Sequence, residues 1–305
     1  MTGDAVAVGG HNGARKSYRL RDEPKVLMPR SLRGIVIAVL SVVIVVPIGY
    51  MVLMSLTPNQ DVALGTISLR VLGIENYVQM WSAAPLASGL LHTIIIAGTA
   101  SAVSVMVALL AAYPLTRFEF RGRRAYLYTL IALQTVPGTT TVLPLFAILS
   151  WIQTTLSVSL IGTYWPIILT YMTFGVPLST WLLVAYLRTV PRDLEEAGLV
   201  DGCSPLGALR RIVLPLALPA MVVAFVFAFL VGWNDVLFAS VFTNQHTQTL
   251  AITLELFSST SFSTGTPVYG ELMSAAVVSS VPVVVLYLVC QRYLVSGLAV
   301  GSLTG

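Results

Sequence analysis

The sequence predicts an all-α membrane protein with six transmembrane helices. Of its 305 residues, 56% are hydrophobic and only 10% are charged, whereas about a quarter of the residues in soluble domains are charged. A bilayer core about 30 Å thick requires roughly 20 apolar residues in a helix. Six largely uncharged windows of about that length occur, at residues 34–56, 90–115, 125–149, 160–187, 216–242 and 271–294. Every other segment is a tail or a connection, which leaves no room for a soluble domain of ordinary size.

The first 33 residues differ from the windows in composition. They are polar and glycine-rich at first and then basic, with too few apolar residues to bury a core. We therefore expect residues 1–33 to form a disordered cytoplasmic tail and residues 34–305 to form the membrane domain. The first window follows this long polar segment without a small-residue cleavage site, which favours a retained helix over a removed signal peptide.

The positive charges indicate which side of the membrane each connection occupies. Seven lie in the N-terminal tail, four between the second and third windows, four between the fourth and fifth, and one at the C-terminal end. Of the 17 Lys and Arg residues, only Arg70 falls on the other side. The positive-inside rule therefore places both termini in the cytoplasm. The charges form no single patch, which argues against a nucleic-acid partner.

The sequence contains no motif of an enzyme site. GGHNGARKS (residues 9–17) is similar to a phosphate-binding loop, but that loop requires glycine directly before its lysine, where Arg15 stands. Histidines and cysteines are few and widely separated, and HExxH, CxxC and GxSxG are absent. We expect no catalytic residue, no metal site and no cofactor bound by this chain. Acids are also nearly absent from the middle of the windows, although proton-coupled carriers usually place acids there.

The connection between the fourth and fifth windows has the features of a short helix that lies outside the membrane. In TVPRDLEEAGLVDG (residues 189–202), Pro191 suits a first helical turn, and three acids complement the positive end of the helix dipole. Gly202 can end the helix in a left-handed conformation. The result is a helix of about ten residues, which is too short and too charged to span a bilayer.

A second short helix is predicted directly after the first. Ser204 can cap it and Pro205 suits its first position, while Arg210 and Arg211 keep it at the cytoplasmic surface. The two arms form an elbow between the fourth and fifth spans. An isolated helix of ten residues is marginal in water, so a partner must pack against the first arm. The alternative is a helix resting on lipid headgroups, but acids beside an anionic leaflet would be repelled.

The elbow resembles the EAA loop of permease subunits from binding-protein-dependent ABC importers, whose pattern is E-A-A-x3-G-x9-I-x-L-P. Six positions within residues 191–215 match: Glu196, Ala197, Gly202, Ile212, Leu214 and Pro215. The third position departs from the pattern, since Gly198 stands where the family favours Ala. Glycine there costs up to about 1 kcal/mol of helix stability, but it keeps the position small enough for a closely packed groove.

Other segments extend the resemblance over roughly residues 34–305. The carbohydrate branch of the family, close to the second permease subunit of maltose-type systems, is similar at ENYVQMW (75–81), AAYPLTRFEFRGRR (111–124), GWNDVLFA (232–239) and CQRYLVSGLAVGSLTG (290–305). The resemblance implies the type I ABC importer permease fold, with a cytoplasmic EAA coupling helix, in a bacterial inner membrane.

The resemblance also implies partners and site residues. The EAA helix would dock into a cleft on a separate ATPase, with Glu196 as the docking acid and Gly202 as the turn. The docking set implied is Glu195, Glu196, Ala197, Gly198, Asp201, Gly202, Ile212, Leu214 and Pro215. ATP and Mg²⁺ would be bound by the ATPase. The implied partners are a second permease in a heterodimer, two ABC ATPases, an extracytoplasmic solute-binding protein facing residues 57–89 and 243–270, a sugar-like substrate and the lipid bilayer.

Four polar residues in or beside the windows are candidates for the substrate path: Gln134, Tyr171, Asn234 and Asp235. Gln134 precedes Pro137, which would kink the third span. Asp235 falls near the outer surface, where it could line a vestibule or simply lie among interfacial residues. Each of these residues could equally make an interhelical hydrogen bond.

The sequence therefore predicts a non-enzymatic permease that moves a sugar or sugar-like solute by alternating access, driven by ATP hydrolysis in another subunit. A secondary carrier driven by an ion gradient is the alternative, and a scaffold subunit without transport activity is a third reading. The lack of mid-membrane acids weakens the carrier, and the docking elbow weakens the scaffold.

Overall fold

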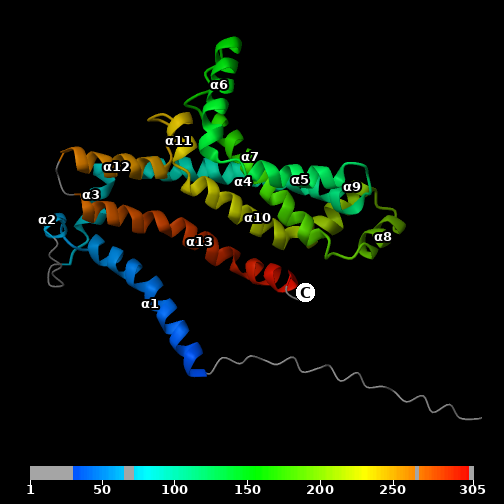
Figure 1. The fold of residues 1–305 in the computed structure, drawn as a ribbon, viewed down its shortest axis with the longest axis horizontal. Coiled ribbons are helices and arrows are strands. Elements are labelled where there is room, and N and C mark those ends of the chain that lie inside the picture. Colours follow the sequence, from blue (N-terminus) through cyan, green and yellow to red (C-terminus); the bar gives the residue numbers. More distant parts are fainter. Residues whose placement is uncertain (1–29, 65–71, 265–267, 302–305) are drawn as a thin grey trace, which may run out of the picture. The chain divides into compact units, whose positions relative to one another are not determined.

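The structure is a computed structural model that describes residues 30–64, 72–264 and 268–301, and every element assigned in these ranges is helical (Figure 1). Most of the predicted N-terminal tail, residues 1–29, lies outside the described residues. The helices are α1 (Arg30–Ser55), α2 (Asn59–Ala63), α3 (Glu75–Ala83), α4 (Leu86–Arg117), α5 (Arg123–Gln134), α6 (Gly138–Leu156), α7 (Tyr164–Leu187), α8 (Asp193–Val200), α9 (Pro205–Ala208), the π-helical segment η1 (Leu209–Val213), α10 (Leu214–Asn234), α11 (Leu237–Phe242), α12 (Leu250–Thr264) and α13 (Tyr269–Gly301).

Within the described residues, six helices are long and apolar enough to cross a membrane. They are Leu32–Ser55, Leu86–Arg117, Gly138–Leu156, Tyr164–Leu187, Pro205–Asn234 and Tyr269–Tyr293. The predicted all-α class with six apolar spans is therefore confirmed. The bounds of the first, second, fourth and sixth spans follow the predicted windows, but the third and fifth do not.

The third predicted span, residues 125–149, is wrong as one continuous helix. α5 ends at Gln134, and α6 begins at Gly138 after an extended Pro137 with ψ of 135°. Proline has no N–H and its ring clashes with the preceding turn, so the expected kink is a complete break. Of the two pieces, only α6 is long enough to span, and it continues beyond the predicted end to Leu156.

The fifth predicted span, residues 216–242, is also interrupted. α10 ends at Asn234, and Asp235 is extended with ψ of 126°. The Asp235 carboxylate accepts hydrogen bonds from the backbone N–H groups of Phe238 at 3.4 Å and Ala239 at 2.9 Å. It thereby caps the first turn of α11, because these N–H groups have no partner within the helix.

The described residues divide into two compact parts, one ending at Ile48 and one beginning at Gly49. The first part contains most of α1. Its apolar side chains are exposed on every face, for example Val43 at 62%, Ile44 at 61% and Val45 at 63%. A helix that is apolar all round is suited to a hydrocarbon environment.

The second part is built around α4, α7 and α10, which pack against one another, with α13 against α10, α12 against α4 and α5 against α7. Small residues recur every four positions along the buried face of α4, at Ala100, Ser104, Ala108 and Ala112. A Cβ added at Gly175 on α7 would come within 2.7 Å of Ser104 Oγ. Small residues at such a spacing let helices approach closely, which is how membrane helices gain packing energy.

One end of the second part is held by polar side chains. Asn59 donates a hydrogen bond to Glu271 at 2.9 Å and accepts one from the N–H of Gly270 at 2.7 Å. Asn76 is buried and donates to the carbonyl oxygens of Ser55 and Thr57 at 2.9 and 2.8 Å. The Asn59 bonds join α2 to the start of α13, and the Asn76 bonds join α3 to the end of α1 and the residues that follow it.

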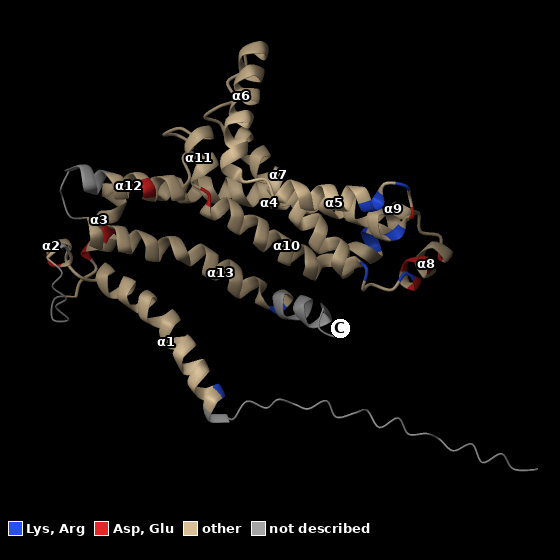
Figure 2. Ribbon diagram, in the orientation of Figure 1, with Lys and Arg blue, Asp and Glu red and all other residues tan. Residues whose placement is uncertain are grey.

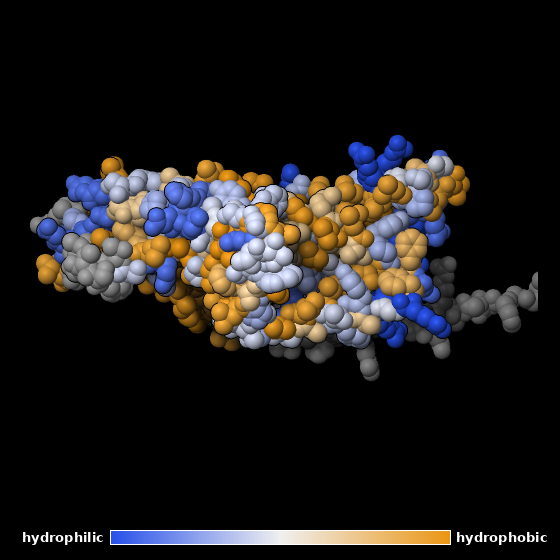
Figure 3. All heavy atoms as spheres, turned by 90° about the horizontal axis from the view of Figure 1, so that it is seen from above, coloured by the Kyte–Doolittle hydropathy of each residue, from blue (hydrophilic) through white to orange (hydrophobic). Residues whose placement is uncertain are grey.

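Positive charge distinguishes the two ends of the second part. Figure 2 shows Lys and Arg gathered at the end that carries α8 and α9, where the acids of α8 also lie, whereas the end that carries α2, α3 and the start of α13 shows acids only among its described residues. On the face seen in Figure 3, apolar side chains cover much of the area. The distribution is that of a membrane protein with one basic boundary.

Candidate functional site

The first arm of the elbow is α8, which has eight residues, Asp193–Val200. Asp193, Glu195 and Glu196 lie in its first turn, where acids stabilise the positive end of the helix dipole. Pro191 precedes the helix, so the arm is slightly shorter than the predicted ten residues.

The turn that ends α8 has the predicted left-handed glycine, Gly202, with φ of +87°. The N–H of Cys203 donates to the carbonyl oxygen of Gly198 at 3.0 Å, and the N–H of Gly202 donates to that of Leu199 at 3.1 Å. These two bonds form a Schellman motif, which satisfies the last carbonyl groups of a helix and reverses the chain.

The second arm begins as predicted. Ser204 is the N-cap of α9, its hydroxyl accepts a hydrogen bond from the N–H of Gly207 at 3.1 Å, and Pro205 takes the first position. The arm is not a separate helix, however. It continues through η1 into α10 and forms one 30-residue helix, Pro205–Asn234. The wider π turn ends at Val213, two residues before Pro215, which cannot donate to the preceding turn.

Gly198, the position that departs from the EAA pattern, lies between the two arms. It is buried, and a Cβ added there would collide with Cδ1 of Ile212 in η1. The third and fifth defined positions of the pattern, Gly198 and Ile212, therefore approach each other within the chain. A small residue is needed at position 198 for the arms to close.

The two adjacent glutamates of α8 differ in their surroundings. Glu195 is buried, and its Oε1 accepts a hydrogen bond from Nε of Arg117 at 2.5 Å. The side chains of Arg117 and Glu195 are 7% and 9% exposed. Glu196, in contrast, is exposed. The sequence alone does not assign Arg117 to the site, because there Arg117 is one of several cations that indicate only the topology.

The outward side of the elbow combines acids with apolar side chains. Glu196, Ala197, Asp201 and Gly202 are exposed there. Val200 and Leu206, which lie between the fourth and fifth predicted spans, are among the most exposed large apolar side chains of the described residues. They are 87% and 71% exposed. Such exposure outside a membrane is typical of a surface that contacts another protein.

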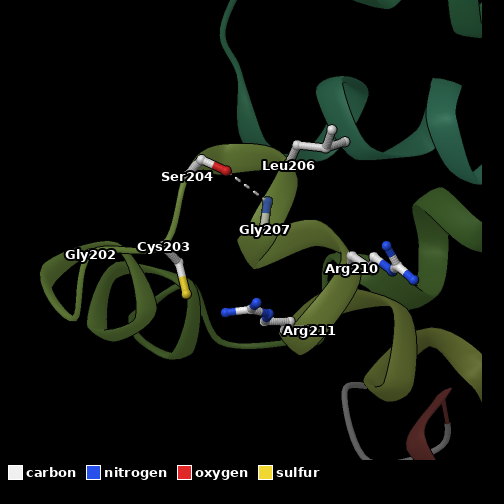
Figure 4. Close-up of a pocket in the computed structure, with 7 residues that line it drawn as sticks. All are labelled: Gly202, Cys203, Ser204, Leu206, Gly207, Arg210 and Arg211. Carbon is white, nitrogen blue, oxygen red and sulfur yellow. Dashed lines mark hydrogen bonds between the residues drawn. The ribbon is translucent and has the colours of Figure 1, made fainter.

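A hollow of about 580 Å³ lies at the bend and is lined by Gly202, Cys203, Ser204, Leu206, Gly207, Arg210 and Arg211 (Figure 4). Arg210 and Arg211 extend in different directions in this view.

The remaining residues of the predicted docking set differ in exposure: Pro215 is exposed, and Ile212 and Leu214 are half-buried.

The four candidate substrate-path residues lie around the breaks of the third and fifth predicted spans. Tyr171 is 4% exposed, and its hydroxyl donates to Oδ2 of Asp235 at 3.0 Å. Asn234 is exposed and donates to the carbonyl oxygen of Leu230 at 2.8 Å. Gln134 is exposed at the end of α5 and reaches the carbonyl oxygen of Phe174 at 3.4 Å.

Aromatic contacts bring the two helix breaks together. The rings of Phe174 on α7 and Phe238 on α11 have centroids 5.3 Å apart. A Cβ added at Gly138, the first residue of α6, would lie 3.2 Å from the Phe238 ring. The interruption between α5 and α6 and that between α10 and α11 therefore meet beside the same stretch of α7.

Comparison with known proteins identifies the chain's relatives. Residues 104–300 match the family described as binding-protein-dependent transport system inner membrane component. The chain belongs to this family. The matched region contains the second half of α4, all of α7 and α10, the elbow and both helix breaks of this permease.

Individual relatives are also similar. The sulfoquinovosyl glycerol transport system permease protein SmoH of Agrobacterium fabrum is 34% identical over 76% of this permease and 78% of its own length. The trehalose/maltose transport system permease protein MalG of Thermococcus litoralis is 33% identical over 76% and 81%. The resemblance to carbohydrate permeases of the maltose type is therefore confirmed.

A solved structure supports the fold. This permease superposes on a chain of a bacterial ABC transporter involved in the import of the acidic polysaccharide alginate with a TM-score of 0.67, covering 87% of this chain and 98% of the other. The two sequences are 21% identical. The predicted type I importer permease fold is confirmed.

Proposed function

We propose that the chain is the permease subunit of an ABC importer that moves a sugar or sugar-like solute into the cell by alternating access, driven by ATP hydrolysis in a separate ATPase subunit. The observation that carries the proposal is the outward side of the elbow. Val200 exposes apolar surface on the same arm as Glu196 and next to Asp201, and Leu206 exposes more on the second arm. This combination fits a protein groove better than water or an anionic leaflet.

The proposed docking residues are divided by their exposure. Glu196, Asp201, Val200 and Leu206 would contact the ATPase, and Gly202 would shape the turn. ATP and Mg²⁺ would be bound by the ATPase and not by this chain. The elbow would lie in the cytoplasm, because the basic end of the second part carries it (Figure 2). Both termini are proposed to lie on the same side of the membrane, because the cations of the sequence flank the spans on that side.

The nature of the solute is proposed from the relatives. SmoH is named for sulfoquinovosyl glycerol and MalG for trehalose and maltose, which supports a carbohydrate or a carbohydrate conjugate as substrate. The family description supports a solute-binding protein as partner. A second permease would complete the path, and the exposed apolar residues of α6, such as Leu143 at 72% and Trp151 at 66%, would contact that subunit or lipid.

The proposed path passes the two helix breaks. Broken helices in membranes expose backbone groups that can bind a solute, and they occur where the backbone lines a cavity. Gln134 and Asn234 are exposed beside these breaks and are proposed to face the solute. Tyr171 and Asp235 are proposed to hold the breaks in place.

The proposal is tested by Glu196→Lys in the complete complex. Reversing this charge should leave the amount of permease in the membrane unchanged and abolish co-purification of the ATPase. Glu119→Lys is the matched control, because Glu119 is exposed at the same basic end but lies outside the elbow. Undiminished co-purification of the Glu196→Lys variant would contradict the docking role.

A second measurement separates the importer from an ion-driven carrier. In vesicles that hold the complex and ATP, uptake of radiolabelled trehalose or maltose should continue when the ion gradient is collapsed. It should stop when the ATPase is omitted. Uptake without the ATPase would overturn the proposal.

A further inference from the structure

The end of α4 and the elbow are joined by a set of hydrogen bonds that the docking role does not require. Arg117 is the last residue of α4. Its Nε donates to Glu195 at 2.5 Å, its Nη1 to the carbonyl oxygen of Leu187 at 3.2 Å, and its Nη2 to that of Val190 at 3.3 Å. One side chain therefore contacts the end of α7, the connection to α8, and α8 itself.

A second arginine, at the start of α8, makes a contact back to the end of α4. Nη2 of Arg192, the N-cap of α8, donates to the carbonyl oxygen of Thr116 at 3.0 Å. The carbonyl groups of Leu187 and Thr116 belong to the last turns of α7 and α4, where carbonyl groups lack partners within their own helices. The Leu187 carbonyl also accepts a bond from the N–H of Val190 at 3.3 Å. The arginines satisfy these groups and fix the position of α8 at the same time.

Among the described residues, Arg117 and Glu195 form an ion pair between α4 and α8. Both side chains are removed from water, so each depends on the other: if one partner is lost, the remaining charge stays buried without compensation. A pair of this kind determines position more than it adds stability. Here the position is that of a helix of eight residues, which is too short to be stable alone.

α4 can pass on a movement that it receives at this end. Its buried small residues Ala108 and Ala112 pack in one cluster with Leu183 and Leu187 of α7 and with Val213 and Ala217 at the start of the fifth span. Close packing of this kind moves as a body instead of deforming. The cluster lies directly behind the Arg117–Glu195 pair, because Leu187 belongs to both sets of contacts.

We propose that Arg117 and Glu195 are positioning residues that clamp α8 to α4, so that a displacement of the elbow by the ATPase turns α4, α7 and α10 together. The inference rests on the proposed function. It removes Glu195 from the docking set, because a carboxylate buried against Arg117 is not available to the ATPase. It also links the elbow to α4, in addition to α7 and α10, to which the elbow is covalently connected.

The neighbouring glutamates provide a matched pair of variants. Glu195→Gln should keep the ATPase bound during purification, because the docking face is intact, whereas Glu196→Lys should lose it. If Glu195→Gln instead loses the ATPase to the same extent as Glu196→Lys, then Glu195 is a docking residue and the clamp is refuted, although the importer stands. If Glu196→Lys retains the ATPase, the proposed function itself fails.

The clamp is tested directly by the distance between α8 and α4. Spin labels are placed at Asp193→Cys and Leu110→Cys, both of which are exposed, in a complex that lacks Cys203 and Cys290. With Arg117 and Glu195 present, the distance distribution should be narrow and the same with and without ATP and vanadate. In Glu195→Gln it should become broader or shift with nucleotide.

The opposite results would overturn the proposal. The clamp is refuted if the α8–α4 distance changes with nucleotide when the pair is intact, or if Glu195→Gln leaves the distribution as narrow as before in both states. Arg117→Gln and the double variant provide a second readout. Because the two side chains act as one unit, trehalose or maltose transported per ATP should fall by roughly fivefold or more in each single variant. The fall in the double variant should be no larger, and additive losses would show that the two residues act independently.

Discussion

The hydroxyl of Tyr171 donates a hydrogen bond to Oδ2 of Asp235 at 3.0 Å and so joins α7 to the interruption between α10 and α11. The Tyr171 ring also lies against Gly232, where an added Cβ would come within 2.9 Å of the ring. The Asp235 carboxylate thus receives a bond from α7 while it caps α11. This arrangement fixes the fifth span at the point where its backbone bonding stops.

Tyr171→Phe should lower the stability of the complex without affecting ATPase binding. The variant keeps the ring but removes one interhelical hydrogen bond, which is worth about 0.6–2 kcal/mol in a bilayer. Thermal unfolding of the purified complex should therefore occur at a lower temperature. Tyr186→Phe, on the same helix, is the control, and equal unfolding temperatures for the two variants would contradict the structural role of the Tyr171 bond.

Gln134→Ala should raise the KM for solute uptake while leaving ATPase co-purification unchanged. The expected rise is roughly two- to tenfold, the effect of losing one hydrogen bond. Thr129→Ala tests whether any polar loss from α5 has the same effect, since Thr129 is exposed on that helix and bonds only within it. A KM for Gln134→Ala equal to that of the control would remove Gln134 from the path.

Gly202→Val should weaken ATPase binding more than Gly202→Asn does. Position 202 has φ of +87°, a conformation that costs an ordinary L residue about 1–2 kcal/mol and that Asn tolerates better than β-branched residues. Gly122, with φ of +96°, also lies at the basic end. Gly122→Val should therefore reduce stability but leave co-purification of the ATPase intact, and equal losses at both positions would argue against a specific role for the Gly202 turn.

Gly198→Leu should separate the two arms of the elbow, whereas Gly198→Ala should be tolerated. An added Cβ meets Cδ1 of Ile212, the flexible end of a side chain that can rotate away from one methyl group but not from an isobutyl group. Alanine also improves helix propensity by about 1 kcal/mol, which offsets the adjustment. Measurement of ATPase co-purification and membrane abundance for both variants checks this, and normal docking by Gly198→Leu would contradict the contact between the arms.

The membrane spans and the elbow could be predicted because local composition determines them. A run of about 20 apolar residues has few alternatives to a transmembrane helix. The cap at Ser204, with Pro205 after it, and the left-handed Gly202 follow from the backbone preferences of those residue types. These features depend on neighbours in the sequence, and the structure agrees with them.

The helix breaks and the contacts of the site depend on residues that are far apart in the chain. Both breaks lie inside long windows that are almost free of charge, so a hydropathy average runs through them. Pro137 indicates a kink, but it does not show that backbone hydrogen bonding ends at Gln134, and no such signal marks the end at Asn234. The Arg117–Glu195 pair joins positions 78 residues apart. In one sequence, a buried arginine cannot be distinguished from the other cations of a basic connection.

The π-helical segment Leu209–Val213 sets the rotational phase between α9 and the fifth span. A π turn accommodates one residue more than an α turn, and each residue of an α-helix corresponds to about 100° of rotation. Removing a single residue from the segment would therefore swing the bend by about that angle around the axis of α10 while every docking side chain kept its identity. In the proposed complex, the alignment of the ATPase with the permease would thus depend on the number of residues in this segment as much as on their type.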